Sequence, residues 1–176
     1  MNLYLIGYRC TGKSTIGRMV AELLSRKFID ADDFLEDYTG RSIRDIFDNE
    51  GEEFFRDLES ECLGRIAAQQ NLVIAAGGGI ILRKGNVELM KSSGCVVLLK
   101  ADVDTIHQRM NSDGRTSLQR PNLTEQAPRD EIVSLLKIRE PLYDAAAEAV
   151  FDTGELTVQE AAEGIADFLL AREEKS

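Results

Sequence analysis

The segment from Gly7 to Ser14 contains the residues whose types and spacing most clearly suggest chemistry. Its sequence, GYRCTGKS, fits the pattern G-x-x-x-x-G-K-[ST], in which backbone N–H groups of a glycine-bearing turn surround phosphate oxygens. An apolar strand expected over residues 2–6 precedes it, and an amphipathic helix from residue 13 to about 26 follows it, as the pattern requires. Lys13 would reach the β- and γ-phosphates and Ser14 would hold Mg²⁺. The segment therefore predicts a nucleoside triphosphate site, but not a particular reaction.

Two carboxylates, Asp30 and Asp32, follow a second short apolar segment. If the strand continues through Asp32, both side chains point the same way, toward the ligand crevice at the carboxyl ends of a parallel sheet. There they could serve Mg²⁺ and an acceptor hydroxyl. Alternatively, both acids cap and open the next helix, where aspartate is favoured in any case. The pattern leaves both interpretations open.

Three consecutive glycines, Gly77 to Gly79, follow a buried strand expected over residues 72–76. Three exceed what a strand end needs, and they let backbone N–H groups approach a ligand closely. Arginines could hold its anionic groups, or could be solvated surface charges. The candidate arginines are Arg56, which lies in an acidic helix, and Arg115, Arg120 and Arg139, which lie in or after a long polar loop over residues 111–128. On such a loop, an arginine can also close over phosphates.

Three further residues of the phosphate-binding segment each allow two interpretations. Tyr8 and Arg9 could contact nucleotide, although exposure in a loop explains them equally well. Cys10 lies beside Arg9 and Lys13 near a helix N-terminus, surroundings that make a thiol reactive. The alternative is that Cys10 is an inert, small loop residue.

The elements that must position these residues alternate between apolar strands and helices. Strands are expected over residues 2–6, 28–32, 72–76, 94–100 and 149–152. Helices are expected over residues 13–26, 33–70 with breaks near Gly40 and Gly51, 86–91, 102–110, 129–140 and 158–172, with Pro141 starting a further turn. Because apolar strands that alternate with helices are typical of parallel sheets covered on both faces, we expect one α/β domain over residues 1–176.

Composition excludes several classes of partner. The 21 Lys and Arg residues against 31 Asp and Glu give a net charge of −10, which disfavours nucleic acid and anionic membranes as partners. No stretch approaches the roughly 20 apolar residues of a transmembrane helix, and no secretory signal is visible. Three cysteines without CxxC spacing argue against a disulfide framework or structural zinc, so we expect a cytoplasmic protein.

The charge is also unevenly distributed along the chain. Residues 28–62 contain thirteen acidic and three basic residues, whereas residues 7–18 contain three basic residues and no acidic one. An anionic ligand therefore remains possible at a locally basic site.

Taken together, the motifs resemble the shikimate kinase family, within the nucleoside-monophosphate-kinase-like group of P-loop kinases. The matching pieces are GYRCTGKST (residues 7–15), DAD (30–32), GEEFFR (51–56), AGGG (76–79), RPNL (120–123) and REPLY (139–143). The phosphate-binding pattern is generic, whereas the combination of GEExFR, GGG and RxPLY is specific among small kinases. The sequence departs from the family pattern at Cys10 and Asn122, and neither position supplies a side chain assigned to the chemistry.

The resemblance implies a three-layer αβα P-loop fold with a five-stranded parallel sheet, an acceptor-binding helical region at about 32–62 and a mobile lid at about 111–124. It implies transfer of the γ-phosphoryl group of ATP to the 3-hydroxyl of shikimate, a step of aromatic amino acid biosynthesis, by a cytoplasmic monomer that uses Mg²⁺. The implied catalytic residues are Lys13, Asp32 and Arg120. The implied ATP site comprises Gly7, Cys10, Thr11, Gly12, Lys13, Ser14, Thr15, Arg115 and Arg120. The implied shikimate site comprises Asp32, Arg56, Gly77, Gly78, Gly79 and Arg139, and the implied metal ligands are Ser14 and, through water, Asp30.

Two alternatives remain at this point. One is another small-metabolite or nucleoside-monophosphate kinase of the same fold, such as a gluconate kinase. A nucleotide acceptor brings a phosphate and a base, however, and Arg56 and Arg139 beside three glycines suit a carboxylate and hydroxyls better. The other is a nucleotide-binding module without turnover, which the presence of Lys13, Asp32 and Arg120 disfavours.

Overall fold

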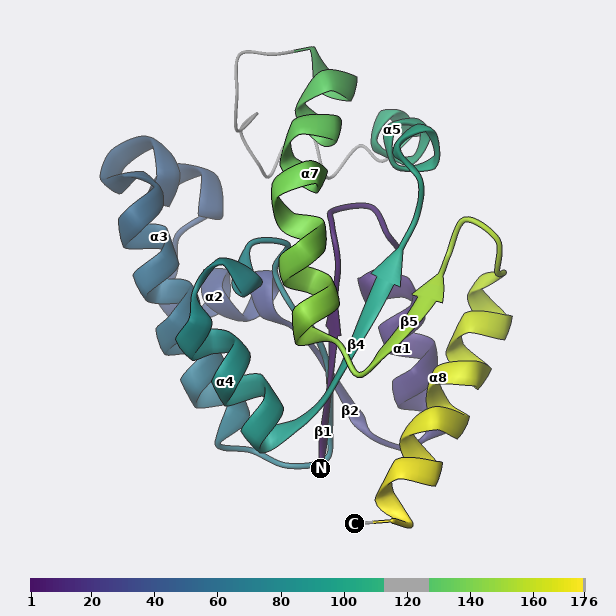
Figure 1. Cartoon of the computed structure of the whole chain (residues 1–176). Coiled ribbons are helices and arrows are strands. Elements are labelled where there is room, and N and C mark those ends of the chain that lie inside the picture. Colours follow the sequence, from purple (N-terminus) through teal and green to yellow (C-terminus); the bar gives the residue numbers. More distant parts are fainter. Residues whose placement is uncertain (113–126, 176) are drawn as a thin grey trace.

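The computed structural model describes residues 1–112 and 127–175 of the chain (Figure 1). One parallel sheet has the strand order β2-β3-β1-β4-β5. The strands are β1 (Asn2–Ile6), β2 (Lys27–Asp30), β3 (Leu72–Ala75), β4 (Gly94–Lys100) and β5 (Ala149–Asp152). The predicted α/β class and five-stranded parallel sheet are confirmed.

Helices cover both faces of the sheet. They are α1 (Lys13–Leu23), α2 (Ala31–Thr39), α3 (Ile43–Ala67), the 3₁₀ turn η1 (Ile80–Leu82), α4 (Lys84–Ser93), α5 (Val103–Ser112), α7 (Pro128–Ala146) and α8 (Val158–Glu173). Along β1, Tyr4 and Ile6 pack with α3, α4 and α7, whereas Leu3 and Leu5 pack with α1 and α8. This alternation of one apolar strand between two cores produces the predicted three-layer arrangement.

Short polar residues fix several of the helix starts. The Ser42 hydroxyl accepts a hydrogen bond from the Asp45 backbone N–H at 3.1 Å, and Thr157 forms a capping box with Glu160. Asp102 accepts from the Thr105 N–H at 2.6 Å, which confirms it as the cap of α5. None of the described helices is long and apolar enough to cross a membrane.

The structure corrects three predicted boundaries. The strand β2 ends at Asp30, and α2 begins at the next residue. The loop predicted over residues 111–128 is wrong at both ends: α5 extends through Ser112, whose hydroxyl bonds back to the Gln108 carbonyl at 2.8 Å, and Pro128 occupies the first turn of α7. Arg115 and Arg120 lie outside the described residues.

The third correction concerns Pro141, which was expected to start a further turn but lies inside the continuous helix α7. An internal proline removes one helical hydrogen bond and costs roughly 3 kcal/mol. Burial of Arg139, Tyr143 and Ala146 on one face of α7 holds the helix together across it. Tertiary packing therefore overrides the local preference of the sequence.

Candidate active site

A groove at the carboxyl ends of the strands contains most of the predicted phosphate-binding residues, and we call it the phosphate groove. Its volume is about 1550 Å³, including space open to solvent. Its lining residues are Cys10, Thr11, Gly12, Lys13, Ser14, Thr15, Ile16, Arg18, Asp30, Asp32, Asp33, Arg109, Thr153, Leu156 and Val158. Gly7 does not line it but contributes a carbonyl that accepts from Lys13 Nζ at 2.9 Å.

The start of α1 is arranged to receive an anion. Gly12 precedes it in a left-handed conformation (φ 93°), and within the described chain no side chain caps this end and no acid occupies its first turn. The helix therefore begins at the groove without a side-chain cap, and its dipole favours negative charge there. Lys13 Nζ adds a positive charge over the loop, where it donates to the carbonyls of Gly7 and Tyr8.

Ser14 and Asp30 are in direct contact, as expected for two residues that share a metal. The Ser14 hydroxyl donates to Asp30 Oδ2 at 2.6 Å, and Asp30 Oδ1 accepts from the Asp32 N–H at 3.1 Å. The capping interpretation of Asp30 is thus confirmed. The expected strand alternation of Asp30 and Asp32 is wrong, because Asp32 already lies in the first turn of α2.

The donor set at Ser14 and Asp30 suits Mg²⁺. Both residues offer oxygen ligands, and among the described residues no cluster of three or more His, Cys, Asp or Glu side chains could hold a metal by itself. Mg²⁺ commonly binds through one or two protein oxygens together with water and substrate phosphates. The site therefore fits a magnesium ion that arrives with a nucleotide.

The other end of the phosphate groove includes an arginine that the sequence patterns did not single out. Arg109 donates to the Thr153 hydroxyl at 3.0 Å and to the Thr153 carbonyl at 2.6 Å. Thr153 in turn donates to the Thr11 carbonyl at 2.9 Å, and Leu156 and Val158 line the same end. A fixed guanidinium plane beside aliphatic side chains can accommodate a flat ring. The position of Thr153, directly after a strand, was the available sequence signal.

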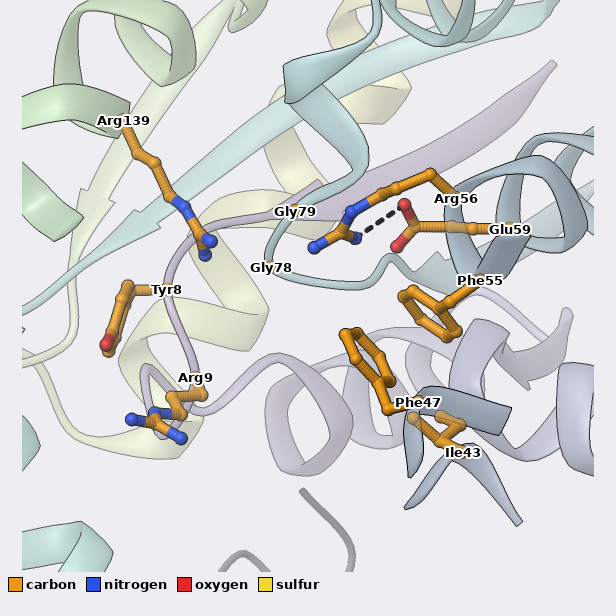
Figure 2. A pocket seen from close by; sticks show the side chains of 10 residues that line it. All are labelled: Tyr8, Arg9, Ile43, Phe47, Phe55, Arg56, Glu59, Gly78, Gly79 and Arg139. Atoms are coloured by element: carbon orange, nitrogen blue, oxygen red, sulfur yellow. Dashed lines mark hydrogen bonds and ion pairs between the residues drawn. The ribbon is translucent and has the colours of Figure 1, made fainter. Parts of the chain in front are cut away.

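A second, smaller cavity lies between the phosphate-binding loop, α3 and α7, and we call it the arginine pocket (Figure 2). Its volume is about 510 Å³, including space open to solvent, which suits a small metabolite rather than a nucleotide. Its lining residues are Tyr8, Arg9, Ile43, Phe47, Phe55, Arg56, Glu59, Gly78, Gly79 and Arg139. Phe47 and Phe55 pack against each other with ring centroids 4.6 Å apart, forming an apolar wall.

Arg56 is held in the pocket by two glutamates of its own helix. Its Nη1 donates to Glu59 Oε2 at 2.8 Å, and its Nη2 donates to Glu52 Oε1 at 3.1 Å. Burial lowers the pKa of Arg56, but the two carboxylates raise it more, so the net pKa lies above its usual value. Burial raises the pKa of Glu59. The positive charge of Arg56 acts to lower that pKa, but the net pKa remains above its usual value. Arg56 is therefore a buried, oriented cation, and its interpretation as a solvated surface charge is wrong.

Arg139 reaches the same pocket from α7 and differs from Arg56 in one respect. It is 7% exposed, yet no ion pair or hydrogen bond joins its guanidinium to any residue that the structure describes. Glu59 also attracts it but is already paired with Arg56. A charge removed from water without its own ion pair is costly unless an anion completes it. This arrangement is what a receptor for a carboxylate requires.

The glycines after β3 allow these charged groups to approach. A side chain at residue 79 would overlap the Arg56 guanidinium. A Cβ on Gly77 would lie 2.6 Å from Glu59 Oε1 and 3.2 Å from Asp32 Oδ1. Gly77 and Asp32 do not line the arginine pocket themselves, but these contacts place the Asp32 carboxylate at the border between the pocket and the phosphate groove.

Three residues of the arginine pocket were missed or misjudged from the sequence. Tyr8 is 2% exposed and packs with α5 and α7, so exposure in a loop does not explain it. Arg9 is also largely buried, and it forms an ion pair with Glu131 at the start of α7. Glu59 stands three residues after Arg56, a helical spacing that could have indicated the pair, although not its burial.

Replacing Glu59 with alanine should lower the free energy of unfolding by about 3–5 kcal/mol, because Arg56 would lose its buried counter-ion. The matched control is Glu52→Ala, which removes the exposed partner of the same arginine and should cost at most about 1 kcal/mol. Urea unfolding of both variants measures the difference. Equal losses would show that burial of the Glu59 pair does not matter.

Cys10 should be the one thiol of this chain that alkylation modifies quickly. Burial, with a smaller contribution from nearby carboxylates, raises the pKa of Cys62 to about 11 and that of Cys95 to about 12, so both are almost wholly protonated at pH 8. Cys10 lines the phosphate groove, where an added carbamidomethyl group would obstruct a nucleotide. We expect iodoacetamide to inactivate the protein, ATP to protect it, and Cys10→Ser to resist inactivation. Stoichiometric labelling of Cys10 with full activity would contradict this.

Comparison with known proteins agrees with this geometry. The family model described as shikimate kinase matches residues 9–170. The chain is 42% identical over 159 residues to a shikimate kinase of Rhodopirellula baltica, covering 90% of this chain and 85% of that protein. It is 40% identical to a shikimate kinase of Pelotomaculum thermopropionicum, covering 96% and 95%. The solved structure of shikimate kinase from Acinetobacter baumannii in complex with shikimate has a TM-score of 0.89 and 38% identity, covering 97% of this chain and 93% of that chain. The chain belongs to the shikimate kinase family.

Proposed function

We propose that this protein transfers the γ-phosphoryl group of ATP to the 3-hydroxyl of shikimate and releases shikimate 3-phosphate and ADP. Family membership supports the reaction, and the observation that carries the acceptor assignment is Arg139, a buried guanidinium that forms no ion pair with the described residues. The substrate carboxylate would complete it, with Arg56 as the second donor. The ring would lie against Phe47 and Phe55.

The nucleotide would occupy the phosphate groove. Its phosphates would bind at the start of α1 and at Lys13, and its base would lie toward Arg109 and Leu156. Ser14 and Asp30 would hold Mg²⁺, which neutralises phosphate charge when bound. Arg120, outside the described residues, is proposed to close on the phosphates.

Asp32 is proposed as the group that orients the acceptor hydroxyl and accepts its proton. Its carboxylate lies beside Gly77, where the arginine pocket meets the phosphate groove. Phosphoryl transfer needs alignment and charge neutralisation more than covalent catalysis. The chain therefore contributes chiefly two aligned sites and one carboxylate between them.

A coupled assay of ADP release decides between this proposal and the other kinases of the fold. We expect shikimate to stimulate ADP release, and gluconate or nucleoside monophosphates to leave it near background. No stimulation by shikimate would overturn the proposal. Stimulation by a nucleoside monophosphate would place the acceptor elsewhere than the arginine pocket.

We further propose that the enzyme acts as a monomer in the cytoplasm. The monomeric state is what the resemblance to the family implies. ATP, its proposed co-substrate, is a cytoplasmic metabolite. Light scattering of the purified protein would test the monomer directly.

A further inference from the structure

The three guanidinium groups of the arginine pocket differ in how their charge is balanced. Arg56 is paired with Glu59, and Arg9 is paired with Glu131. Arg139 forms no ion pair with the residues described, although Glu59, which is already paired with Arg56, also attracts it. Glu52, the other partner of Arg56, is 54% exposed, so solvent screens its charge. Among the buried groups that the structure describes here, three positive charges and two negative charges leave one net positive charge.

The Arg9–Glu131 pair is shielded from solvent. The Arg9 side chain is 9% exposed and that of Glu131 is 2% exposed, and Arg9 Nη2 donates to Glu131 Oε1. The Nε atom of Arg9 is buried without a hydrogen-bond partner in the described chain, and its guanidinium carbon lies 5.6 Å from the centroid of the Tyr8 ring. Water therefore does not substitute for Glu131 as the group that balances Arg9.

The position of this pair makes its charge relevant to the ligand. Arg9 lines the arginine pocket from the side opposite Arg56 and Glu59 (Figure 2). The backbone nitrogen of Arg9 would lie 3.7 Å from a Cβ on Gly78, so the loop and the glycines meet at this wall. An uncompensated charge on Arg9 would act on any anion bound between these walls.

We propose that Glu131 determines the charge specificity of the arginine pocket: by cancelling Arg9, it makes the pocket select monoanionic ring acids over dianionic ones. This rests on the proposed function, since it assumes that an anionic acceptor binds in this pocket. One carboxylate matches the one unbalanced guanidinium, Arg139. A second negative group within the pocket, as in a ring dicarboxylate, would find the other two guanidinium groups already neutralised.

Glu131→Gln tests this by exposing the charge of Arg9 while keeping the shape of the side chain. Because Coulombic attraction scales with ligand charge, we expect affinity to rise about threefold for a monoanion and about tenfold for a dianion of the same shape. A matched pair of probes is 3,5-dihydroxybenzoate and 5-hydroxyisophthalate, which differ in one hydroxyl replaced by a carboxylate. The affinities of both probes are measured by ligand-detected NMR titration at pH 8 and constant ionic strength. Saturating Mg-ADP is present throughout, so that it occupies the phosphate groove and keeps both probes out of it.

The wild-type protein should bind the monoanion more tightly than the dianion. In Glu131→Gln the ratio of the monoanion affinity to the dianion affinity should fall about threefold. Equal changes for both probes, or weaker binding of both, would overturn the proposal. The double variant Arg9→Gln/Glu131→Gln removes both charges and should restore the wild-type preference. If it instead behaves like Glu131→Gln, the pair serves only to position the loop, and the proposal is wrong.

If Glu131→Gln fails to fold, Arg9→Gln provides a test of opposite sign. It removes the positive charge of Arg9 and keeps the negative charge of Glu131, so both probes should bind more weakly and the dianion should lose more. An equal loss for both would overturn the proposal. These titrations require no turnover, so failure of the proposed function appears separately, as wild-type protein that does not respond to shikimate in the ADP-release assay.

Discussion

Asp32→Asn is expected to lower kcat for shikimate phosphorylation by about 10²- to 10⁴-fold, the usual contribution of a positioned proton acceptor. Asparagine has nearly the same shape and can still hydrogen-bond the acceptor hydroxyl, but it does not take up the proton. The backbone N–H of residue 32, which donates to Asp30, is unchanged by the substitution. The cap of α2 and its contact with Ser14 should therefore survive, and the KM for ATP should stay within about threefold.

The matched control is Asp33→Asn, which removes the same charge from the same first turn of α2. Both aspartates line the phosphate groove, but it is the Asp32 carboxylate that lies beside Gly77, with Oδ1 3.2 Å from where a Cβ on that glycine would be, at the border of the arginine pocket. We expect kcat to change less than about threefold in Asp33→Asn. Steady-state kinetics with both substrates varied gives the comparison, and near-normal kcat in Asp32→Asn would remove this carboxylate from the mechanism.

Local patterns predicted those parts of the site that are built from contiguous residues. The phosphate-binding loop and the three glycines each lie within one strand–turn unit, so their spacing alone indicates that backbone N–H groups face a ligand. The boundary at Asp30 was missed because the same aspartate both ends a strand and caps a helix. Ending the strand at Asp30, two residues earlier than expected, changes the direction in which Asp32 points.

Contacts between distant parts of the chain could not be predicted in the same way. Arg9 and Glu131 are 122 residues apart, and Arg109 and Thr153 are 44 apart. No periodicity links such pairs, because only the folded sheet brings α5, α7 and the loop together. The resemblance supplied the roles of Arg56 and Arg139, but it did not indicate that one is paired and the other is not.

That difference leads to the second large effect. Arg139→Lys should raise the KM for shikimate by about 30- to 150-fold, since loss of paired charge-assisted hydrogen bonds costs about 2–3 kcal/mol even when the positive charge remains. The KM for ATP should stay within about threefold, because Arg139 lines the arginine pocket and not the phosphate groove. An equal rise in both KM values would indicate a general disturbance of α7 instead.

Stability measurements should distinguish the two arginines proposed to bind shikimate, Arg56 and Arg139, even where kinetic measurements do not. Arg139→Met removes a buried cation that forms no ion pair with the described residues, so the ligand-free protein should unfold at a higher temperature than wild type. Arg56→Met leaves Glu59 buried without its partner and should lower the free energy of unfolding by about 3–5 kcal/mol. Both variants should lose the rise in Tm that shikimate gives the wild type, since a ligand stabilises only a protein that binds it. If Arg139→Met is stabilised and shikimate still raises its Tm, the substrate carboxylate is bound elsewhere. If Arg139→Met is instead destabilised, Arg139 supports the fold, and its charge is not reserved for binding the substrate.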